Sequence, residues 1–347
     1  MLECMSGRID AFHLMKFSRL ASLFACPLFV AVTLCLVNCG GNDPAPEENR
    51  EVAPAPAPQP KPEPVVTNWT DVKLHASIRK VNPNYSGNGM FAIDPEGQPR
   101  QIVLADCGIE SLAWIKGMPM LQIIDLQKNP LSDISPLAGL KGLQNLYLES
   151  TAVTDISALG GMSLDELYLT ATPLKDLSPL KTMKVNKLNL VNTPVTDLTP
   201  LAGVPIQSLW LTDTPVKDIS GLEKVQGLVS LTLHRTQVED LTPLTSGLYP
   251  QGLRLHIGGT PATDVSPLAK VPLSRLVFSP EKITKGMDVI RQLPIREIGT
   301  EFEDGKNNLL PASAFWPKYD AEKAAPAVPA EPKKAAIPAP ASAPAAE

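Results

Sequence analysis

Seven aspartates recur through the middle of this 347-residue chain, and a row of carboxylates is a candidate cation site. They lie 21 to 24 residues apart. They are Asp133, Asp155, Asp176, Asp197, Asp218, Asp240 and Asp264. Most precede a Ser/Thr-Pro step, where a carboxylate can accept backbone N–H bonds of a turn. A calcium site draws several oxygens from one loop, whereas each copy here supplies one carboxylate. We therefore predict structural turn caps and no metal.

Histidine and cysteine offer the other candidate chemistry. His234 and His256 fall in neighbouring copies and could share a metal, but ordinary surface side chains are the favoured interpretation. Cys107 takes a position that is Thr or Asn in other copies, so a small buried side chain is favoured over a reactive thiol. The chain has no serine nucleophile elbow, phosphate loop, HExxH or CxxC. We predict neither an enzyme nor a cofactor.

These residues are positioned by a repeat of about 21 residues. Each copy opens with Leu-x-Leu, as at Leu188 and Leu190, which predicts a short strand with its leucines inward. A Thr-Pro step then turns the chain, and Ser/Thr-Pro-Leu, as at Ser178-Pro179-Leu180, reads as a hydroxyl-capped helix start. So short a period leaves room for only one or two 3₁₀ turns before the next parallel strand.

The residue between the two leucines must point to the open face of the sheet. Down the array this row reads Val103, Asp125, Tyr147, Tyr168, Asn189, Trp210, Thr232, His256 and Val277. Three of the nine Tyr and Trp residues fall in it, and exposed aromatics are enriched at binding surfaces. Glu166, Lys187 and Arg254 lie in the neighbouring row. We predict that Tyr147, Tyr168, Asn189, Trp210, His256 and these three residues contact a ligand. Packing of aromatics across strands is the alternative.

The pattern LxxLxLxxTxVxDLxPL over about residues 100–300 resembles the short leucine-rich repeat of internalin-type bacterial proteins. The resemblance implies an α/β solenoid, a right-handed horseshoe or arc with a parallel sheet on its concave face and short 3₁₀ or α turns outside. Asn129 alone keeps the usual Asn after the strand, and Thr elsewhere predicts a hydroxyl-based side-chain ladder. The flanks around 81–85, 283–287 and 315–320 look like end caps of planctomycete and verrucomicrobial leucine-rich repeat lipoproteins, which implies a Gram-negative-type envelope.

Segments outside the repeats complete the predicted organisation. A short helix capped by Thr70 or Asp71 and a hairpin of 90–93 with 101–104 are predicted to form an N-terminal cap within 67–100. Repeats fill 101–300, with a short helix over 284–293 capped by Thr284, and 301–320 forms a C-terminal cap. The Pro/Ala-rich segments 39–66 and 321–347 are expected to be disordered.

The first 38 residues read as a secretory signal, with Met15 as a plausible true start that leaves 1–14 upstream of it. An apolar run over 20–37 is followed by Asn38-Cys39-Gly40, which resembles a bacterial lipobox and implies that Cys39 is lipidated. An uncleaved membrane anchor and plain secretion are the alternatives. All three export the repeats, and the resemblance favours a lipid anchor in the outer membrane.

The charge balance narrows the class of partner. The formal net charge is −5, with no Lys/Arg block that would track a phosphate backbone, so nucleic acid is not expected. We predict a monomeric, non-enzymatic envelope module whose concave face binds a protein or a glycan. The alternative is a structural envelope spacer without a specific ligand.

Overall fold

The computed structural model describes residues 68–300, 302–303 and 306–324. The predicted signal segment, Cys39, the linker and nearly all of the C-terminal tail lie outside the described residues. Among the residues that are described, no helix is both long and apolar enough to cross a membrane.

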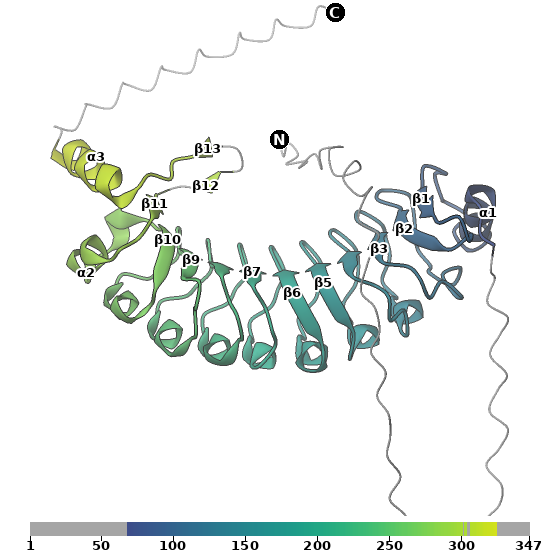
Figure 1. The fold of residues 1–347 in the computed structure, drawn as a ribbon, viewed down its shortest axis with the longest axis horizontal. Helices are drawn as coiled ribbons and strands as arrows, with labels where there is room; N and C mark the ends of the chain where they lie inside the picture. Colours follow the sequence, from purple (N-terminus) through teal and green to yellow (C-terminus); the bar gives the residue numbers. More distant parts are fainter. Residues whose placement is uncertain (1–67, 301, 304–305, 325–347) are drawn as a thin grey trace, which may run out of the picture. The chain divides into compact units, whose positions relative to one another are not determined.

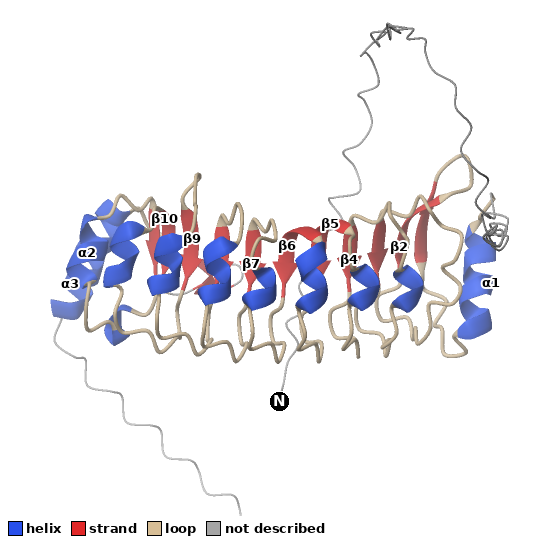
Figure 2. Ribbon diagram, turned by 90° about the horizontal axis from the view of Figure 1, so that it is seen from below, coloured by secondary structure: helices blue, strands red, loops and turns tan. Residues whose placement is uncertain are grey.

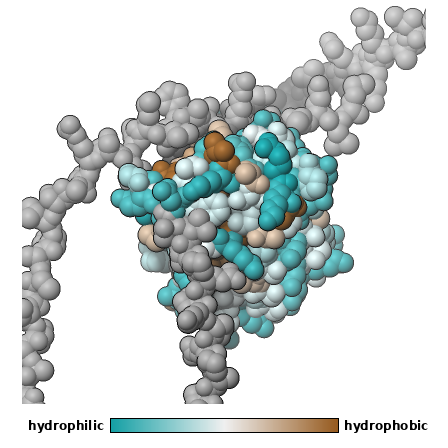
Figure 3. Space-filling view, turned by 90° about the vertical axis from the view of Figure 1, so that its right-hand side faces the viewer, coloured by the Kyte–Doolittle hydropathy of each residue, from teal (hydrophilic) through white to brown (hydrophobic). Residues whose placement is uncertain are grey.

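Helix α1 (Asp71–Val81) opens the described chain. The Thr70 hydroxyl accepts a hydrogen bond from the backbone N–H of Lys73, and Leu74 and Ile78 face the core. Strand β1 (Met90–Ile93) then pairs antiparallel with β2 (Pro99–Val103), which confirms the predicted hairpin. The end face formed by this cap is mainly hydrophilic, with a few hydrophobic side chains (Figure 3). The cap therefore shields the apolar interior of the first coil from water.

One sheet of eleven strands runs through the repeats in chain order, from β1 to β11. From β2 onward all neighbours are parallel. The remaining strands are β3 (Ile123–Asp125), β4 (Asn145–Tyr147), β5 (Ser163–Tyr168), β6 (Lys184–Asn189), β7 (Ser208–Trp210), β8 (Ser230–Thr232), β9 (Leu253–His256), β10 (Leu273–Val277) and β11 (Glu297–Gly299). The strands line the concave side of the arc that the repeats form (Figure 1). The predicted open solenoid is confirmed.

Short 3₁₀ helices occupy the opposite, convex side of the coils that follow β3 (Figure 2). They are η2 (Ser135–Leu137), η3 (Ser157–Leu159), η4 (Ser178–Thr182), η5 (Thr199–Leu201), η6 (Ser220–Lys224), η7 (Thr242–Ser246), η8 (Ser266–Lys270) and η9 (Pro280–Lys282). Leucines from both sides of each coil meet in a continuous apolar interior, where Leu180 and Leu188 are fully buried. The coils between β3 and β10 close without an α-helical crossover because each return leg is only one or two turns long.

The aspartate row caps these turns. Asp176 Oδ1 accepts the N–H of Ser178 at 2.8 Å, and the other six aspartates bond the residue two positions on in the same way. The expectation that the hydroxyl itself caps the helix is wrong: Leu177 is the N-cap residue, and Ser178 Oγ donates to Asp176 Oδ2 at 2.7 Å. The carboxylate is the better acceptor for the free N–H because it is charged.

The side chains after the strands also differ from expectation. Asn129 bridges two coils, because its Oδ1 accepts the N–H groups of Cys107 and Ile109 and its Nδ2 donates to Leu104 and Leu126 carbonyls. The threonines do not continue this ladder. Each, like Thr172, donates its hydroxyl to the carbonyl three residues earlier in its own coil. A hydroxyl has one donor and lacks the amide that spans both coils.

A column of left-handed residues follows the strands. Seven non-glycine residues have φ between 53° and 58°. They are Asp106, Lys128, Ser150, Ala171, Asn192, Asp213 and Arg235. This conformation is disfavoured for residues with a Cβ, so the repeat geometry imposes it.

The C-terminal cap contains α2 (Met287–Gln292), β12 (Phe302–Glu303), β13 (Lys306–Asn307) and α3 (Ala312–Ala324). Phe315 and Trp316 of α3 are buried. Helix α2 begins three residues later than predicted and Thr284 does not cap it, because 284 and 285 still bond to Thr263 of the previous coil. Helix α3 continues four residues beyond the predicted boundary at 320.

Candidate functional site

The row of side chains predicted for the concave face is in register. Tyr147 pairs with Tyr168, Tyr168 with Asn189, and Asn189 with Trp210 on successive parallel strands. Tyr147, Tyr168 and Trp210 are each half-buried. We call these three residues the aromatic row. Alternation along each strand places them on the side away from the leucines.

The rings of the aromatic row touch edge to face. The Tyr147 and Tyr168 centroids are 5.3 Å apart at 87°, and those of Tyr168 and Trp210 are 6.1 Å apart at 64°. Such contacts hold aromatic rings in fixed orientations. The row is therefore a preorganised surface of partly exposed rings, and ring packing and ligand binding are compatible at this position.

Polar neighbours anchor one end of the aromatic row. Tyr147 Oη donates to Glu166 Oε2 at 2.5 Å, and Lys187 Nζ lies 2.6 Å from Glu166 Oε1. Burial alone would raise the pKa of Glu166, but the hydrogen bonds from Lys187 and Tyr147 outweigh it and lower that pKa. Asn189 is also engaged, since its Oδ1 accepts the Thr170 hydroxyl at 3.0 Å. These predicted contact residues thus form an internal network before any ligand binds.

The N-terminal half of the concave face is acidic. Asp125 is 8% exposed, and burial raises the pKa of its carboxyl. Burial, with smaller contributions from Asp125 and Glu166, raises the pKa of Glu149 to about 7. Burial of carboxylates side by side penalises their charged forms, so this half of the face disfavours a further negative group.

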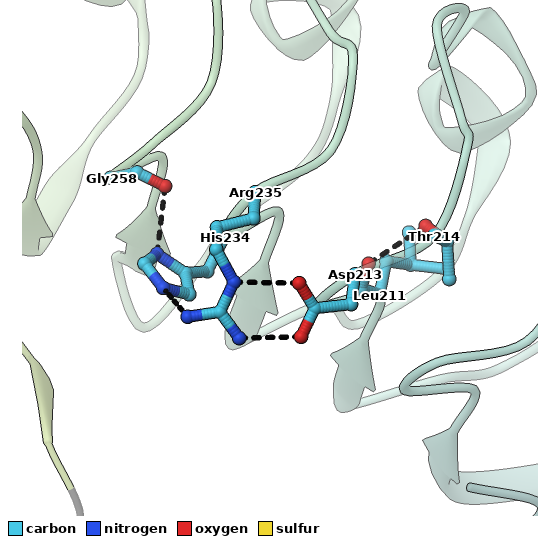
Figure 4. A network of polar contacts seen from close by, with 6 residues as sticks. All are labelled: Leu211, Asp213, Thr214, His234, Arg235 and Gly258. Atoms are coloured by element: carbon cyan, nitrogen blue, oxygen red, sulfur yellow. Dashed lines mark hydrogen bonds and ion pairs between the residues drawn. The ribbon is translucent and has the colours of Figure 1, made fainter. Parts of the chain in front are cut away.

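A second polar network lies on the neighbouring coils (Figure 4). His234 Nδ1 is 2.8 Å from the Gly258 carbonyl oxygen and so carries the proton, and Arg235 Nη1 lies 2.7 Å from His234 Nε2. Arg235 also makes a two-pronged ion pair with Asp213, with Nε 2.6 Å from Oδ1. Burial, followed by the positive charge of Arg235, lowers the pKa of His234. The network therefore holds a neutral imidazole.

His256 stacks on His234, with ring centroids 4.6 Å apart. Burial lowers the pKa of His256 to about 4, and only 8% of the residue is exposed. A Cβ at Gly258 would lie 2.9 Å from His256 Nε2, so a side chain there would push the His256 ring out of its position. His256 therefore offers little surface to a ligand, contrary to its predicted role, because the adjacent ring and backbone cover it.

The other residues singled out from the sequence differ in their exposure to solvent. Arg254 is exposed on the concave face, whereas Val277 in the central row is 1% exposed. Cys107 is buried, which raises the pKa of its thiol. Within the described part of the chain, no group of three or more His, Cys, Asp or Glu residues is arranged to hold a metal ion. Sequence reasoning missed the Asp213–Arg235 pair, although both residues occupy the same position in adjacent coils and both have positive φ.

Comparison with known proteins agrees with this geometry. A family model for leucine-rich repeats in two copies matches residues 119–161. The repeats are similar to the leucine-rich repeats of internalins. An internalin (InlF) of Listeria monocytogenes is 27% identical, with a TM-score of 0.50 over 67% of this chain and 68% of that one. Internalin C2 of the same organism is 22% identical, with a TM-score of 0.48 over 62% of this chain and 100% of that one. No curated protein matches the sequence.

Leucine-rich repeat proteins are typically protein-binding modules, and their fold is typically a scaffold without enzymatic activity. In this protein the concave face of the solenoid carries the aromatic row, an acidic half and a stacked histidine pair. The arrangement supplies contact surface and hydrogen bonds.

Proposed function

We propose that the protein is an exported binding module that recognises a protein partner through its concave face. The observation that carries this proposal is the aromatic row, in which Tyr147, Tyr168 and Trp210 remain partly exposed on adjacent or near-adjacent strands. Large, rigid rings supply contact area at a low cost in conformational entropy. Rings of this kind are the usual anchors of protein interfaces.

The contacts around the row support the same function. The Glu166–Lys187 ion pair and the Tyr147 hydroxyl bond fix the polar groups beside the rings. A partner that binds here meets side chains whose rotamers are already restricted, which reduces the ordering cost of association.

The experiment is affinity capture from an envelope extract with the full mature chain. We expect Tyr147→Ala combined with Trp210→Ala to weaken capture of a specific partner at least tenfold, since loss of two anchors costs about 2 kcal/mol or more. The control combines Val72→Ala and Leu248→Ala, which remove exposed apolar side chains from outside the aromatic row. Unchanged capture by the Tyr147/Trp210 variant, with both variants folded, would instead favour a spacer without a specific ligand.

We further propose that Cys39 carries the lipid that anchors the protein in the outer membrane. The support is the signal-like segment and the Asn38-Cys39-Gly40 junction. We expect Cys39→Ser to move the protein from the membrane fraction to the soluble fraction, and mass spectrometry to find a diacylglyceryl group on Cys39 of the wild type. A mature N-terminus upstream of Cys39 would contradict this assignment.

A further inference from the structure

A groove of about 750 Å³ lies beside the C-terminal cap, at the end of the concave face away from the acidic half. Arg254 and Arg275 line it from strands β9 and β10, and Arg296 lines it from the residue before β11. Val229 and Pro311 provide apolar contact, and Gln251 and Ser274 provide polar contact. We call it the arginine groove.

The three guanidinium groups are not equally available. Arg275 Nε lies 2.7 Å from Glu297 Oε2, so this arginine is already paired with a carboxylate. Arg254 and Arg296 are exposed, and neither forms an ion pair with any residue that the structure describes. Among the described side chains that line the groove, Glu297 is the one carboxylate. Three arginines against one glutamate leave two positive charges uncompensated among these described side chains.

A second hollow, of about 450 Å³, continues the charge over the rim of the sheet. It shares Gln251, Ser274 and Arg296 with the arginine groove and adds Lys270 and the apolar Leu293. The positive surface is thus continuous from the concave face to the convex edge and has apolar contacts along it. Guanidinium groups beside apolar walls suit carboxylates carried on a peptide.

We propose that the arginine groove binds acidic side chains of an extended segment of the protein partner. This inference rests on the proposed function and assigns the chemistry of the part of the partner that docks beside the C-terminal cap. Arg254 and Arg296 each pair with one carboxylate, and Arg275 remains held by Glu297. The other half of the face carries Asp125, Glu149 and Glu166, and its Lys187 is already paired with Glu166, so that half offers an acidic segment no comparable site.

The spacing of the coils also sets the spacing of the acidic residues. Parallel strands lie about 4.8 Å apart, so the coils that carry Arg254 and Arg296 are separated by about 10 Å. A peptide in the extended polyproline II conformation that runs along the solenoid axis rises about 3.1 Å per residue with three residues per turn, so residues i and i+3 lie on the same face about 9 Å apart. The preferred segment therefore carries Asp or Glu at positions i and i+3.

The test selects displayed random dodecapeptides on the full chain and measures the affinity of one enriched peptide by fluorescence anisotropy. We expect the wild type to enrich peptides with Asp or Glu at i and i+3. Arg254→Gln with Arg296→Gln should weaken the enriched peptide at least tenfold, since charged hydrogen bonds are the stronger ones. Arg254→Lys with Arg296→Lys should retain part of the affinity because the charge remains. The charge-matched control, Lys181→Gln with Lys217→Gln, removes two exposed charges outside the groove and should bind as the wild type does.

Three outcomes would overturn the inference. Enriched peptides without acidic residues would exclude it, and dependence of those peptides on Tyr147 and Trp210 would leave the proposed function standing. Equal affinity of acidic peptides for the Gln variant and the wild type would place their binding elsewhere. Failure to enrich any peptide, with binding of a heparin octasaccharide that the Gln variant loses, would assign the groove to a polyanionic glycan.

Discussion

Glu149 is a residue whose ionisation the fold opposes. Its Oε2 is buried and makes no hydrogen bond, and burial is the first cause that raises its pKa to about 7. The ordinary value is 4.5, so the native state binds more protons than the unfolded chain between pH 4.5 and 7. The free energy of unfolding therefore falls as pH rises through this range, and the penalty is complete above pH 7.

Glu149→Gln should remove this penalty. We expect the free energy of unfolding of the variant to be about 1–2 kcal/mol higher than that of the wild type at pH 8, allowing for partial solvent screening. At pH 5 the two proteins should differ little. Urea unfolding at the two pH values measures the difference. Glu239→Gln, at an exposed position, is the matched control. An equal gain at pH 5 and pH 8 would show that the carboxyl is not the cause.

At the scale of the single coil, the left-handed column is where local preference and repeat geometry disagree. Ala171 has φ of 56°, and its N–H donates to the Val191 carbonyl of the next coil at 2.9 Å. The backbone bond between coils holds the residue in a conformation that alanine disfavours by about 1–2 kcal/mol.

Ala171→Gly should therefore stabilise the protein. Glycine adopts positive φ freely but loses more entropy on folding, so we expect a net gain of about 0.5–1 kcal/mol. The comparison is Ala152→Gly, at an exposed position without positive φ, which should lose about 0.5 kcal/mol. Thermal unfolding followed by circular dichroism measures both. If Ala171→Gly destabilised the protein as much as Ala152→Gly does, the backbone at Ala171 would not be strained.

The coil also explains what could be predicted from sequence. Because each Leu-x-Leu forms one strand and every strand pairs with the next, the period alone placed Tyr147, Tyr168 and Trp210 in one row. The left-handed column was missed because Lys128, Ala171 and Arg235 carry no turn signal.

The repeat period does not predict which side chains pair with one another. Whether Arg235 bonds to Asp213, or Lys187 to Glu166, depends on rotamers that the repeat does not specify. The arginine groove is lined in part by Pro311 of the C-terminal cap, which lies 57 residues after Arg254 in the sequence. The repeat pattern does not predict that these two residues line the same groove. The low exposure of His256 likewise depends on its contact with His234 of the previous coil.

At the scale of the whole solenoid, backbone bonds join each coil only to its neighbours, and α1 and α3 lie at opposite ends of the array (Figure 1). The bonds between strands point along the line that joins those ends. Tension applied at residues 68 and 324 therefore loads one pair of strands at a time. We expect the described chain to open as a zipper, at low force, in steps that each release one coil of about 70 Å contour length. Optical tweezers measure these steps, and one rupture of the full length would contradict the mechanism. If a partner binds along the row of strands, its contacts with the solenoid would then be lost one coil at a time under tension.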